Sequence, residues 1–326
     1  MGRADTARAR GRLVESTPTR ATMFGLSAAH LQVLLDGARK WFLIGNVASA
    51  PAQLFIDAPF GRFTPSEHSV FLVDGIKAWI VMELVSPAFF LYALFSGPNA
   101  HPPALGSPKS ILVGAFLVHY FNRALVSPLR TPSRSKAHLI VPLCAVAFNT
   151  LNGSLMGAFL TSPTPPAPAP YFYAGLALWA LGFAGNIAHD EILLNIRRRA
   201  KDKPKDKPKG EHYAIPHGLL YRFVSYPNYF CEWCEWLGFA VAADPRLVSA
   251  LFSGSLLSGG FSMASASAAL RGPAANFLPF VSAPWVFLIS EVVLMFPRAY
   301  RGHRWYHDTF GDKYPKERKI AVPFVL

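Results

Sequence analysis

The sequence is poor in charged residues and in cysteine. Asp, Glu, Lys and Arg make up only 16% of the 326 residues, whereas hydrophobic residues make up 52%. A soluble domain carries about 25% charged residues, so this balance excludes an ordinary soluble protein and indicates a membrane protein with several spans. The three cysteines are an odd number without framework spacing, which argues against a scaffold held by disulfide bonds.

Two nucleotide-binding motifs are also missing. The sequence contains neither a GxGxxG nor a GxxxxGK[ST] pattern, so membrane helices, not a Rossmann turn or a P-loop, would have to hold any dinucleotide. Acidic residues are scarce beside basic ones, with 19 Asp and Glu against 32 Lys and Arg and a net charge of +13. The cations gather in short segments between apolar runs, which favours lipid headgroups or an anionic cofactor over nucleic acid as their partner.

Seven apolar runs follow one another along the chain. Each is roughly long enough to cross the ~30 Å hydrocarbon core of a bilayer. They predict an all-α, polytopic membrane protein with seven transmembrane helices, expected to be a monomer. The runs lie near residues 41–57, 78–97, 111–129, 138–161, 171–190, 227–252 and 278–297.

The charged segments predict the domain limits and the orientation. Residues 1–25 are expected to be a disordered basic extension, and residues 26–326 a single membrane domain with a basic loop at 198–210. Basic segments follow the third, fifth and seventh runs, so all three fall on one side if seven helices span. The positive-inside rule then places this side and the C-terminus in the cytoplasm, and the arginine-rich N-terminus on the opposite side.

Ionisable and amide side chains form stripes on several apolar runs. In the segment YFCEWCEWLGFAV (229–241), Glu232 and Glu235 share a helical face with Asn228. A carboxylate at the centre of a span costs roughly 2.5–3.5 kcal/mol, so such groups usually mark a functional site. They could instead pair with one another and close the bundle, but stripes on four helices favour a polar cavity. The other stripe residues are Glu83, Tyr120, Arg123, Ser127, Asn186, Asp190, Arg197, Arg298, His303 and Tyr306.

The segment from Cys231 to Cys234 has the CxxC spacing of a metal-binding or redox pair. No second CxxC and no nearby His pair accompany it. We therefore interpret both cysteines as small packing residues, and we predict no metal site.

Four segments together resemble the steroid 5α-reductase family, and most of all its plant members that act in brassinosteroid synthesis. They are APFGRF, FLVHYFNRALVSPLR, IPHGLLYRFVSYPNYFCEWCEWLGFAV and FPRAYRGHRWYHDTFGDKYPKERKIAVPFVL, and the likeness runs from about residue 40 to 326. The resemblance implies a seven-helix fold in the endoplasmic reticulum membrane that encloses a cofactor and substrate cavity. It also implies hydride transfer from NADPH to the Δ4 double bond of a 3-oxo-Δ4-steroid, giving the 5α-reduced 3-oxo-steroid.

The resemblance also implies roles for individual residues. Glu83 and Tyr120 would bind the 3-keto oxygen, and Trp79 would pack on the steroid. Glu83 stands alone in its apolar run, where burial disfavours a charge, so we expect it to be neutral and to donate a hydrogen bond. Glu235 would brace its helix. The residues expected to line the NADPH cavity are Arg123, Asn186, Asp190, Arg197, Tyr213, Asn228, Glu232 and Tyr306.

The sequence departs from the family pattern in three places. Ala214 stands where mammalian members have Arg, the loop 198–210 is longer and richer in lysine, and residues 246–276 are expected to be an insertion before the last helix. Very-long-chain enoyl-CoA reductases and polyprenol reductases are alternative assignments, although Glu83 and the E-x-x-E-W pair favour the steroid branch. An inactive sterol-binding membrane protein is the alternative outside enzymes.

Overall fold

The computed structural model describes residues 23–64, 69–99, 101–201, 213–254 and 263–325. The predicted N-terminal extension falls outside these ranges up to residue 22. Residues 23–25 form a 3₁₀ turn in which Met23 is buried. Most of the predicted basic loop 198–210 and the middle of the predicted insertion 246–276 also lie outside the described residues.

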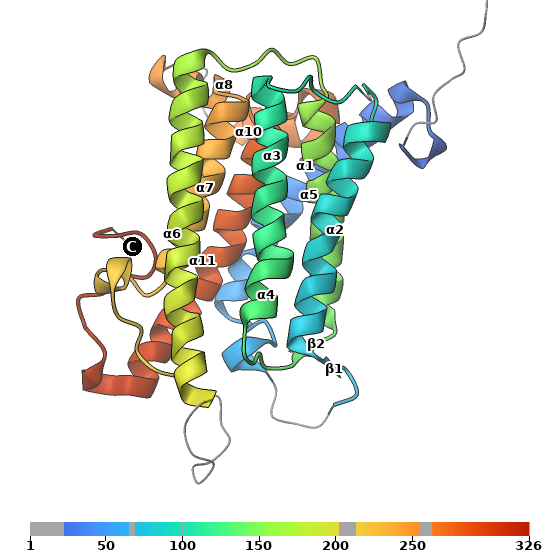
Figure 1. Ribbon diagram of the computed structural model, residues 1–326. Coiled ribbons are helices and arrows are strands. Elements are labelled where there is room, and N and C mark those ends of the chain that lie inside the picture. The colour runs from blue at the N-terminus through green and yellow to red at the C-terminus, as the bar shows by residue number, and fades with distance from the viewer. Residues whose placement is uncertain (1–22, 65–68, 100, 202–212, 255–262, 326) are drawn as a thin grey trace, which may run out of the picture.

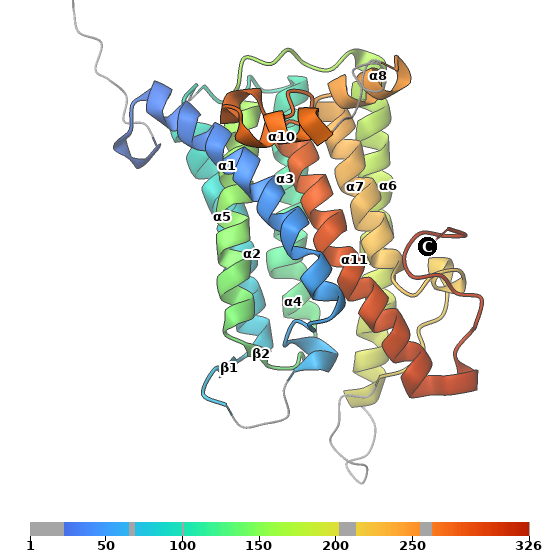
Figure 2. The ribbon, with the colours of Figure 1, turned by 180° about the vertical axis from the view of Figure 1, so that it is seen from behind.

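Long helices make up the described chain, and they pack into one bundle (Figures 1 and 2). A two-residue pair of antiparallel strands, β1 (Leu72–Val73) and β2 (Ala137–His138), joins two connecting segments with Leu72 opposite His138. The long helices are α1 (Ala28–Ser49), α2 (Gly75–Ser96), α3 (Pro108–Phe121), α5 (Ile140–Leu160), α6 (Ala169–Lys201), α7 (Pro227–Ala243) and α11 (Ala283–Phe310). The short helices are α4 (Ser127–Arg130), α8 (Arg246–Phe252) and α10 (Met263–Arg271).

Each predicted apolar run overlaps one long helix, so the helical, multi-pass character of the protein is confirmed. Five helical stretches in the described chain are long and apolar enough to cross a membrane: 75–96, 108–130, 140–160, 169–200 and 283–313. The other two long helices, α1 and α7, do not meet this standard. Helix α7 has only 17 residues, and α1 carries Asp36, Arg39 and Lys40. Seven spans therefore stay a prediction.

Two predicted run boundaries were wrong, and the local chemistry explains both. The first helix begins at Ala28, not near residue 41, because Ser27 caps it by accepting a hydrogen bond from the His30 amide. It ends before Pro51, which has no N–H for a continuing helix. The run 227–252 is broken at Asp244, whose side chain accepts from the backbone N–H of Arg246 and so starts the separate helix α8.

Two helix pairs pack through glycine. Helices α6 and α7 approach so closely that a Cβ on Gly182 or Gly238 would overlap backbone atoms of the partner helix. Gly153 and Gly157 of α5 meet the backbone of α2 in the same way. Small residues at the contact let membrane helices approach this closely. The α6–α7 contact brings Asn186 beside the Glu232 turn of the neighbouring helix, so it builds one wall of the polar interior described below.

Aromatic side chains fill the bundle next to this polar interior. Phe116 of α3 stacks on Phe90 of α2 with ring centroids 4.1 Å apart, and Trp236 of α7 lies 4.6 Å from Phe287 of α11. Phe90, Phe116 and Trp236 are almost completely buried. This core fixes the spacing of α2, α3, α7 and α11, which carry the polar stripes.

The two ends of the bundle differ. The C-terminal ends of α4, α6 and α11 meet at one end, whereas α8, α10 and the α5–α6 connection lie at the other (Figure 1). The three basic segments therefore leave the bundle at a shared end, as predicted from the sequence. At the opposite end, Lys40 of α1 donates to the carbonyl oxygens of Leu270 and Gly272 at 2.6 and 2.8 Å and holds the α10 segment against α1. The assignment of the basic end to the cytoplasm stays a prediction.

The C-terminal segment returns to the start of α7. The amides of Ser225 and Tyr226 donate to the carbonyls of Lys319 and Ile320 at 2.9 and 3.0 Å. The Ser225 hydroxyl lies 2.6 Å from both His303 Nδ1 and the Tyr314 hydroxyl. These bonds fix the turn that leads into the Asn228–Glu232–Glu235 stripe.

Candidate active site

A single cavity of about 420 Å³ runs between α2, α3, α6, α7 and α11. It extends from Glu83 and His119 inside the bundle to Arg62 and Arg197 at the basic end. All the residues that the sequence predicted for the site line this cavity except Tyr120. The lining members of that prediction are Trp79, Glu83, Arg123, Asn186, Asp190, Arg197, Tyr213, Asn228, Glu232 and Tyr306.

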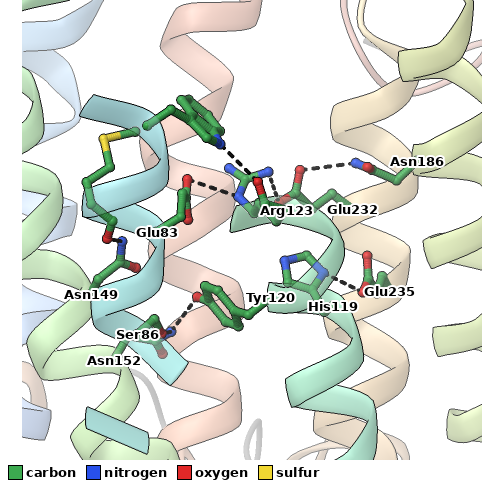
Figure 3. Close-up of polar contacts among 12 residues, drawn as sticks. Glu83, Ser86, His119, Tyr120, Arg123, Asn149, Asn152, Asn186, Glu232 and Glu235 are labelled. Atoms are coloured by element: carbon green, nitrogen blue, oxygen red, sulfur yellow. Dashed lines mark hydrogen bonds and ion pairs between the residues drawn. The ribbon is translucent and has the colours of Figure 1, made fainter. Parts of the chain in front are cut away.

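Arg123 lies at the centre of the inner end of the cavity, where it joins three helices (Figure 3). Its Nε is 3.2 Å from Glu83 Oε1 on α2, and its Nη1 is 2.9 Å from Glu232 Oε1 on α7. A π-helical turn, Asn122–Val126, interrupts the α3–α4 helix at this residue, a feature that is frequent at functional sites. The inner end is defined below as Glu83, Arg123, Asn186 and Glu232.

The structure gives Glu83 a partner that the sequence did not assign. Glu83 is the lone acid of its apolar run, residues 78–97, and no cation lies within this run. In the structure it is buried and accepts a hydrogen bond from the Arg123 guanidinium. The sequence could not reveal this partner, because Arg123 belongs to another helix.

Amide groups extend the inner end along α6 and α7. Asn186 Nδ2 donates to Glu232 Oε2 at 3.2 Å and to the carbonyl of Asn228 at 3.1 Å. The Asn228 side chain in turn donates to Asp190 Oδ1 at 3.0 Å. The stripe residues of these two helices therefore form one chain of hydrogen bonds, as their helical spacing predicted.

Tyr120 lies in the wall of the bundle outside the cavity lining. Its hydroxyl oxygen accepts from Asn152 Nδ2 at 3.1 Å, and the same amide donates to Ser86 Oγ at 3.3 Å (Figure 3). The side chain is buried against Phe116.

Trp79 is held between two cations. Its indole N–H donates to the Arg123 carbonyl at 3.1 Å, and the Arg134 guanidinium lies 3.9 Å from the ring centroid. Burial lowers the pKa of Arg134 to about 10, and the charges of Arg197 and Arg123 act in the same direction. Arg134 remains a cation at neutral pH. A bound anion would stabilise it together with the neighbouring arginines Arg123 and Arg197.

Two arginines that sequence reasoning did not assign to the cofactor lie at the basic end of the cavity. Arg62 rests on the rings of Trp305 and Tyr306, 4.3 and 4.7 Å from their centroids, and Arg298 lies 3.5 Å from the centroid of Phe60. In each, Nη1 is buried without a hydrogen-bond partner among the described residues. Such donors are costly unless an acceptor reaches them. Arg62, Arg134, Arg197 and Arg298 are called the outer end below.

The signals for these two arginines were present in the sequence but were weak. Arg62 falls in APFGRF, where aromatic residues flank a Gly-Arg pair, and this segment lies in a connection between helices. Arg298 was placed in a polar stripe, but its contact with Phe60 joins segments far apart in the chain. Cation–π pairs of this kind are common with arginine, yet they are visible only once the fold brings the rings together.

A buried histidine–carboxylate pair was also missed. His119 Nδ1 of α3 lies 2.7 Å from Glu235 Oε1 of α7, and His119 lines the cavity (Figure 3). Its position four residues before Arg123, on the same helical face, was the available signal. The predicted role of Glu235 as a brace between helices is compatible with this contact.

The cysteines of the CxxC segment lie apart from the inner end. Cys231 is buried and packs against Gly185 of α6, while Cys234 is half-buried. The Cys231 thiol faces α6, where Gly185 lies opposite it and His189 Nδ1 is 3.7 Å from the sulfur. This geometry agrees with the interpretation of Cys231 as a packing residue.

Comparisons with known proteins show the family to which the chain belongs. Residues 135–266 and 274–326 match the family model described as 3-oxo-5-alpha-steroid 4-dehydrogenase. The seven residues left out between these ranges fall inside the segment expected to be an insertion. An uncharacterized protein of Schizosaccharomyces pombe is 36% identical over 88% of this chain and 96% of its own length.

Named relatives come from animals and plants. The 3-oxo-5-alpha-steroid 4-dehydrogenase 1 of Rattus norvegicus is 33% identical over 83% of this chain and 87% of its own length. A steroid 5-alpha-reductase of Solanum lycopersicum is 28% identical over 83% of this chain and 89% of its own length. The chain therefore belongs to the 3-oxo-5-alpha-steroid 4-dehydrogenase family of membrane oxidoreductases.

Proposed function

We propose that this protein reduces the Δ4 double bond of a 3-oxo-Δ4-steroid with a hydride from NADPH, giving the 5α-reduced 3-oxo-steroid. One observation is the main support for this proposal. A single cavity joins a buried cluster of acids and one arginine to an end rich in arginine and aromatic rings. The first part suits a polarised ketone, and the second suits an anionic dinucleotide.

The residues at the outer end fit the phosphates of NADPH. The unpartnered Nη1 atoms of Arg62 and Arg298 call for acceptors, and phosphate oxygens are strong ones. Arg134 and Arg197 would add positive charge for the 2′-phosphate, which distinguishes NADPH from NADH. Tyr213 and Tyr306 would flank the bound nucleotide. When bound, the cofactor supplies the hydride, and the chain supplies position and electrostatics.

The amide chain of the inner end would hold the nicotinamide part. Asn186 and Asn228 offer both donors and acceptors to a carboxamide, and Glu232 accepts from Asn186 and forms an ion pair with Arg123. These groups are already connected to one another, so a carboxamide or a ribose hydroxyl that enters would meet side chains fixed in place. Fixed donors and acceptors reduce the reorganisation needed during the reaction.

The ketone would be polarised from the wall formed by α2 and α3. Hydride addition at the β-carbon of an enone moves negative charge onto the ketone oxygen, so donors placed there stabilise the transition state. Tyr120 would donate its phenol proton, with its oxygen held in place by the amide of Asn152. Glu83, held by Arg123, would orient the ketone, and its protonated form would donate as well. Trp79 would pack on the steroid rings.

The test is a direct assay of the full chain, purified in detergent or reconstituted in lipid. NADPH consumption and product mass would be followed with a panel of 3-oxo-Δ4-steroids, enoyl-CoA thioesters and polyprenols. We expect reduction of a 3-oxo-Δ4-steroid with a mass gain of two hydrogens. Turnover of an enoyl-CoA or a polyprenol alone would assign the chain to that branch, and steroid binding without turnover would indicate an inactive sterol-binding protein.

The cellular setting is part of the same proposal. We place the protein in the endoplasmic reticulum membrane with its C-terminus in the cytoplasm, because the three basic segments leave the bundle at one end (Figure 1). That end also carries the proposed phosphate-binding arginines, where a water-soluble cofactor would arrive. Protease protection of a C-terminal tag in sealed microsomes measures this orientation, and a protected tag would contradict it.

A further inference from the structure

The proposed reaction consumes a proton as well as a hydride. When the hydride adds to the β-carbon, the electrons of the C=C bond move toward the ketone and leave an enolate. The α-carbon of this enolate must then form a C–H bond with a proton. The residues assigned above to the ketone and to the cofactor leave the source of this proton open.

A buried pair beside the assigned residues has the required position. His119 Nδ1 and Glu235 Oε1 are 2.7 Å apart, with 5% and 0% of their side chains exposed. The imidazole lies between Glu235 and Tyr120 (Figure 3), with the Tyr120 ring centroid 5.1 Å away. His119 lines the cavity, whereas Glu235 is not part of its lining. One member of the pair therefore faces the substrate space, and the other is sealed in the helix contact behind it.

Resting on the proposed function, we propose that His119 donates this proton from Nε2 to the α-carbon, with Glu235 as its positioning partner. The shared proton can sit on Glu235 Oε1 or on His119 Nδ1, and in both cases Nε2 also carries a hydrogen. After the transfer, the Nε2–H bond is broken, the α-carbon has its new C–H bond, and the shared proton remains on Nδ1. The pair changes from net neutral to an imidazole with a carboxylate, and a solvent proton restores it.

The unpartnered oxygen of Glu235 supports a chemical role. Oε2 is buried without a hydrogen-bond partner among the described residues. A carboxyl that only braced two helices would be expected to satisfy both oxygens, because an unpaired buried acceptor costs stability. The positive charge of Arg123 also acts on Glu235, so the carboxylate formed by the proton transfer would lie in the field of this cation, which it would share with Glu83 and Glu232.

Other charged groups interact electrostatically with His119 and Glu235, so the protonation of the pair depends on them. His119 interacts electrostatically with Glu83 of α2, Arg123, whose π-helical turn follows α3, and Glu232 of α7. Glu235 interacts in the same way with Glu291 of α11. A pH profile of the reaction therefore reports this set as a coupled group. The test below uses the pH profile only for comparison between variants.

The experiment compares His119→Gln, His119→Gly and Glu235→Gln in the full chain, with His138→Gln as the matched control. His138 pairs with Leu72 in the small sheet and is not in the cavity lining. We expect kcat for a 3-oxo-Δ4-steroid to fall about 10²-fold or more in the His119 variants, the usual contribution of a general acid. NADPH affinity and the steroid KM should change less than about threefold, since neither ligand loses a binding contact. The control should keep wild-type kcat.

Added imidazole supplies a readout that a structural role would not change. In His119→Gly it should restore part of kcat, with a pH dependence that follows the added base. His119→Gln can still bond to Glu235, and it carries the test if the glycine variant does not fold. Wild-type kcat in both His119→Gln and Glu235→Gln, with steroid reduction intact, would overturn the pair alone. Failure of the wild-type chain to reduce any 3-oxo-Δ4-steroid would overturn this proposal together with the proposed function.

Discussion

The inner and outer ends of the cavity satisfy their charges in opposite ways. At the inner end, Arg123 lies between Glu83 and Glu232, so this arginine is paired with acidic groups of the protein without any ligand. At the outer end, Arg62 and Arg298 rest on aromatic rings and keep buried N–H groups without partners among the described residues. The arginine of the inner end therefore has acidic partners within the protein, whereas Arg62 and Arg298 of the outer end have no ion pair with an acid among the described residues.

Because of this difference, substitutions at the two ends should affect different quantities: the stability of the free protein at the inner end and the affinity for an anion at the outer end. Breaking a compensated buried cluster leaves a bare charge and costs stability of the free protein. Removing a cation that has no partner costs the free protein little and is felt when an anion binds. The two ends should therefore respond to matched arginine substitutions with opposite patterns of stability and ligand affinity.

The largest effect is expected from Arg123→Leu. It would leave Glu83 and Glu232 buried without their cation, and removing one partner of a buried ion pair costs about 3–5 kcal/mol of unfolding free energy. Thermal unfolding in detergent without ligand measures this loss. Arg130→Leu is the control, because its ion pair with Glu191 is partly exposed and should contribute less than about 1 kcal/mol. Equal melting temperatures for the two variants would contradict the view of the inner end as a compensated cluster.

The next effect concerns rate. Glu83→Leu and Tyr120→Phe should each lower kcat/KM for the steroid by about 10²–10³, the usual loss for one oxyanion donor. The two losses should be less than additive if both groups serve one oxygen. Glu83→Gln can still donate a hydrogen bond and should keep part of the activity.

NADPH affinity separates this rate effect from cofactor binding. Tyr120→Phe should leave it nearly unchanged, because Tyr120 lies outside the cavity lining. The Glu83 variants should change it more, because Glu83 holds Arg123. Wild-type turnover in both Glu83→Leu and Tyr120→Phe would show that the ketone is polarised elsewhere.

A smaller effect is expected at the outer end, on cofactor affinity. Arg62→Leu, Arg298→Leu and Arg197→Ala should each weaken NADPH binding by about tenfold to a hundredfold, since a charge-assisted bond contributes about 1.5–3 kcal/mol. Their melting temperatures without NADPH should stay near the wild-type value. Arg304→Leu, an exposed residue of the same helix as Arg298, is the control.

Cofactor choice sharpens the same prediction. We expect the wild-type chain to prefer NADPH over NADH, because the outer-end cations would meet the extra phosphate. Arg197→Ala, which would remove a cation assigned to the 2′-phosphate, should weaken this preference while binding NADH about as well as the wild-type chain does. Equal kcat/KM for the two nucleotides in the wild-type chain would contradict the assignment.

The smallest effect is expected from Cys231→Ala combined with Cys234→Ala. Both ends of the cavity should be intact, because Cys231 packs on Gly185 and neither thiol bonds to the inner-end residues. Steroid turnover and NADPH affinity should stay within a few-fold of wild type. Loss of nearly all turnover, or of a bound metal measured by elemental analysis, would show that the cysteines do more than pack.

The sequence predicted the helices and most of the cavity because both depend on local pattern. Apolar runs marked every long helix, and helical spacing placed Asn186 with Asp190, and Asn228 with Glu232, on single faces. The helix ends at Ala28 and Asp244 were missed because capping by a neighbouring side chain is weaker in the sequence than a continuous apolar run.

The contacts between helices could not be predicted from spacing. The partner of Glu83 lies 40 residues away and the partner of His119 lies 116 residues away, so nothing in either local segment reveals them. The sequence therefore assigned no partner to Glu83. Arg62 was likewise left out of the site, because its aromatic neighbours Trp305 and Tyr306 come from the other end of the chain.

The glycine contacts of the bundle limit how the cavity can change shape. Helices α6 and α7 touch backbone to backbone at Gly182 and Gly238, and α2 and α5 do so at Gly153 and Gly157. The contacts at these points are made mainly by backbone atoms, which have no rotamers to change, so we expect each pair to move as one unit. Any widening that admits a bulky ring system must occur between the units, and the only residue bonded to acids on both of them among the described residues is Arg123. The Arg123 side chain, which pairs with the buried acids, thus also links the α2–α5 unit to the α6–α7 unit.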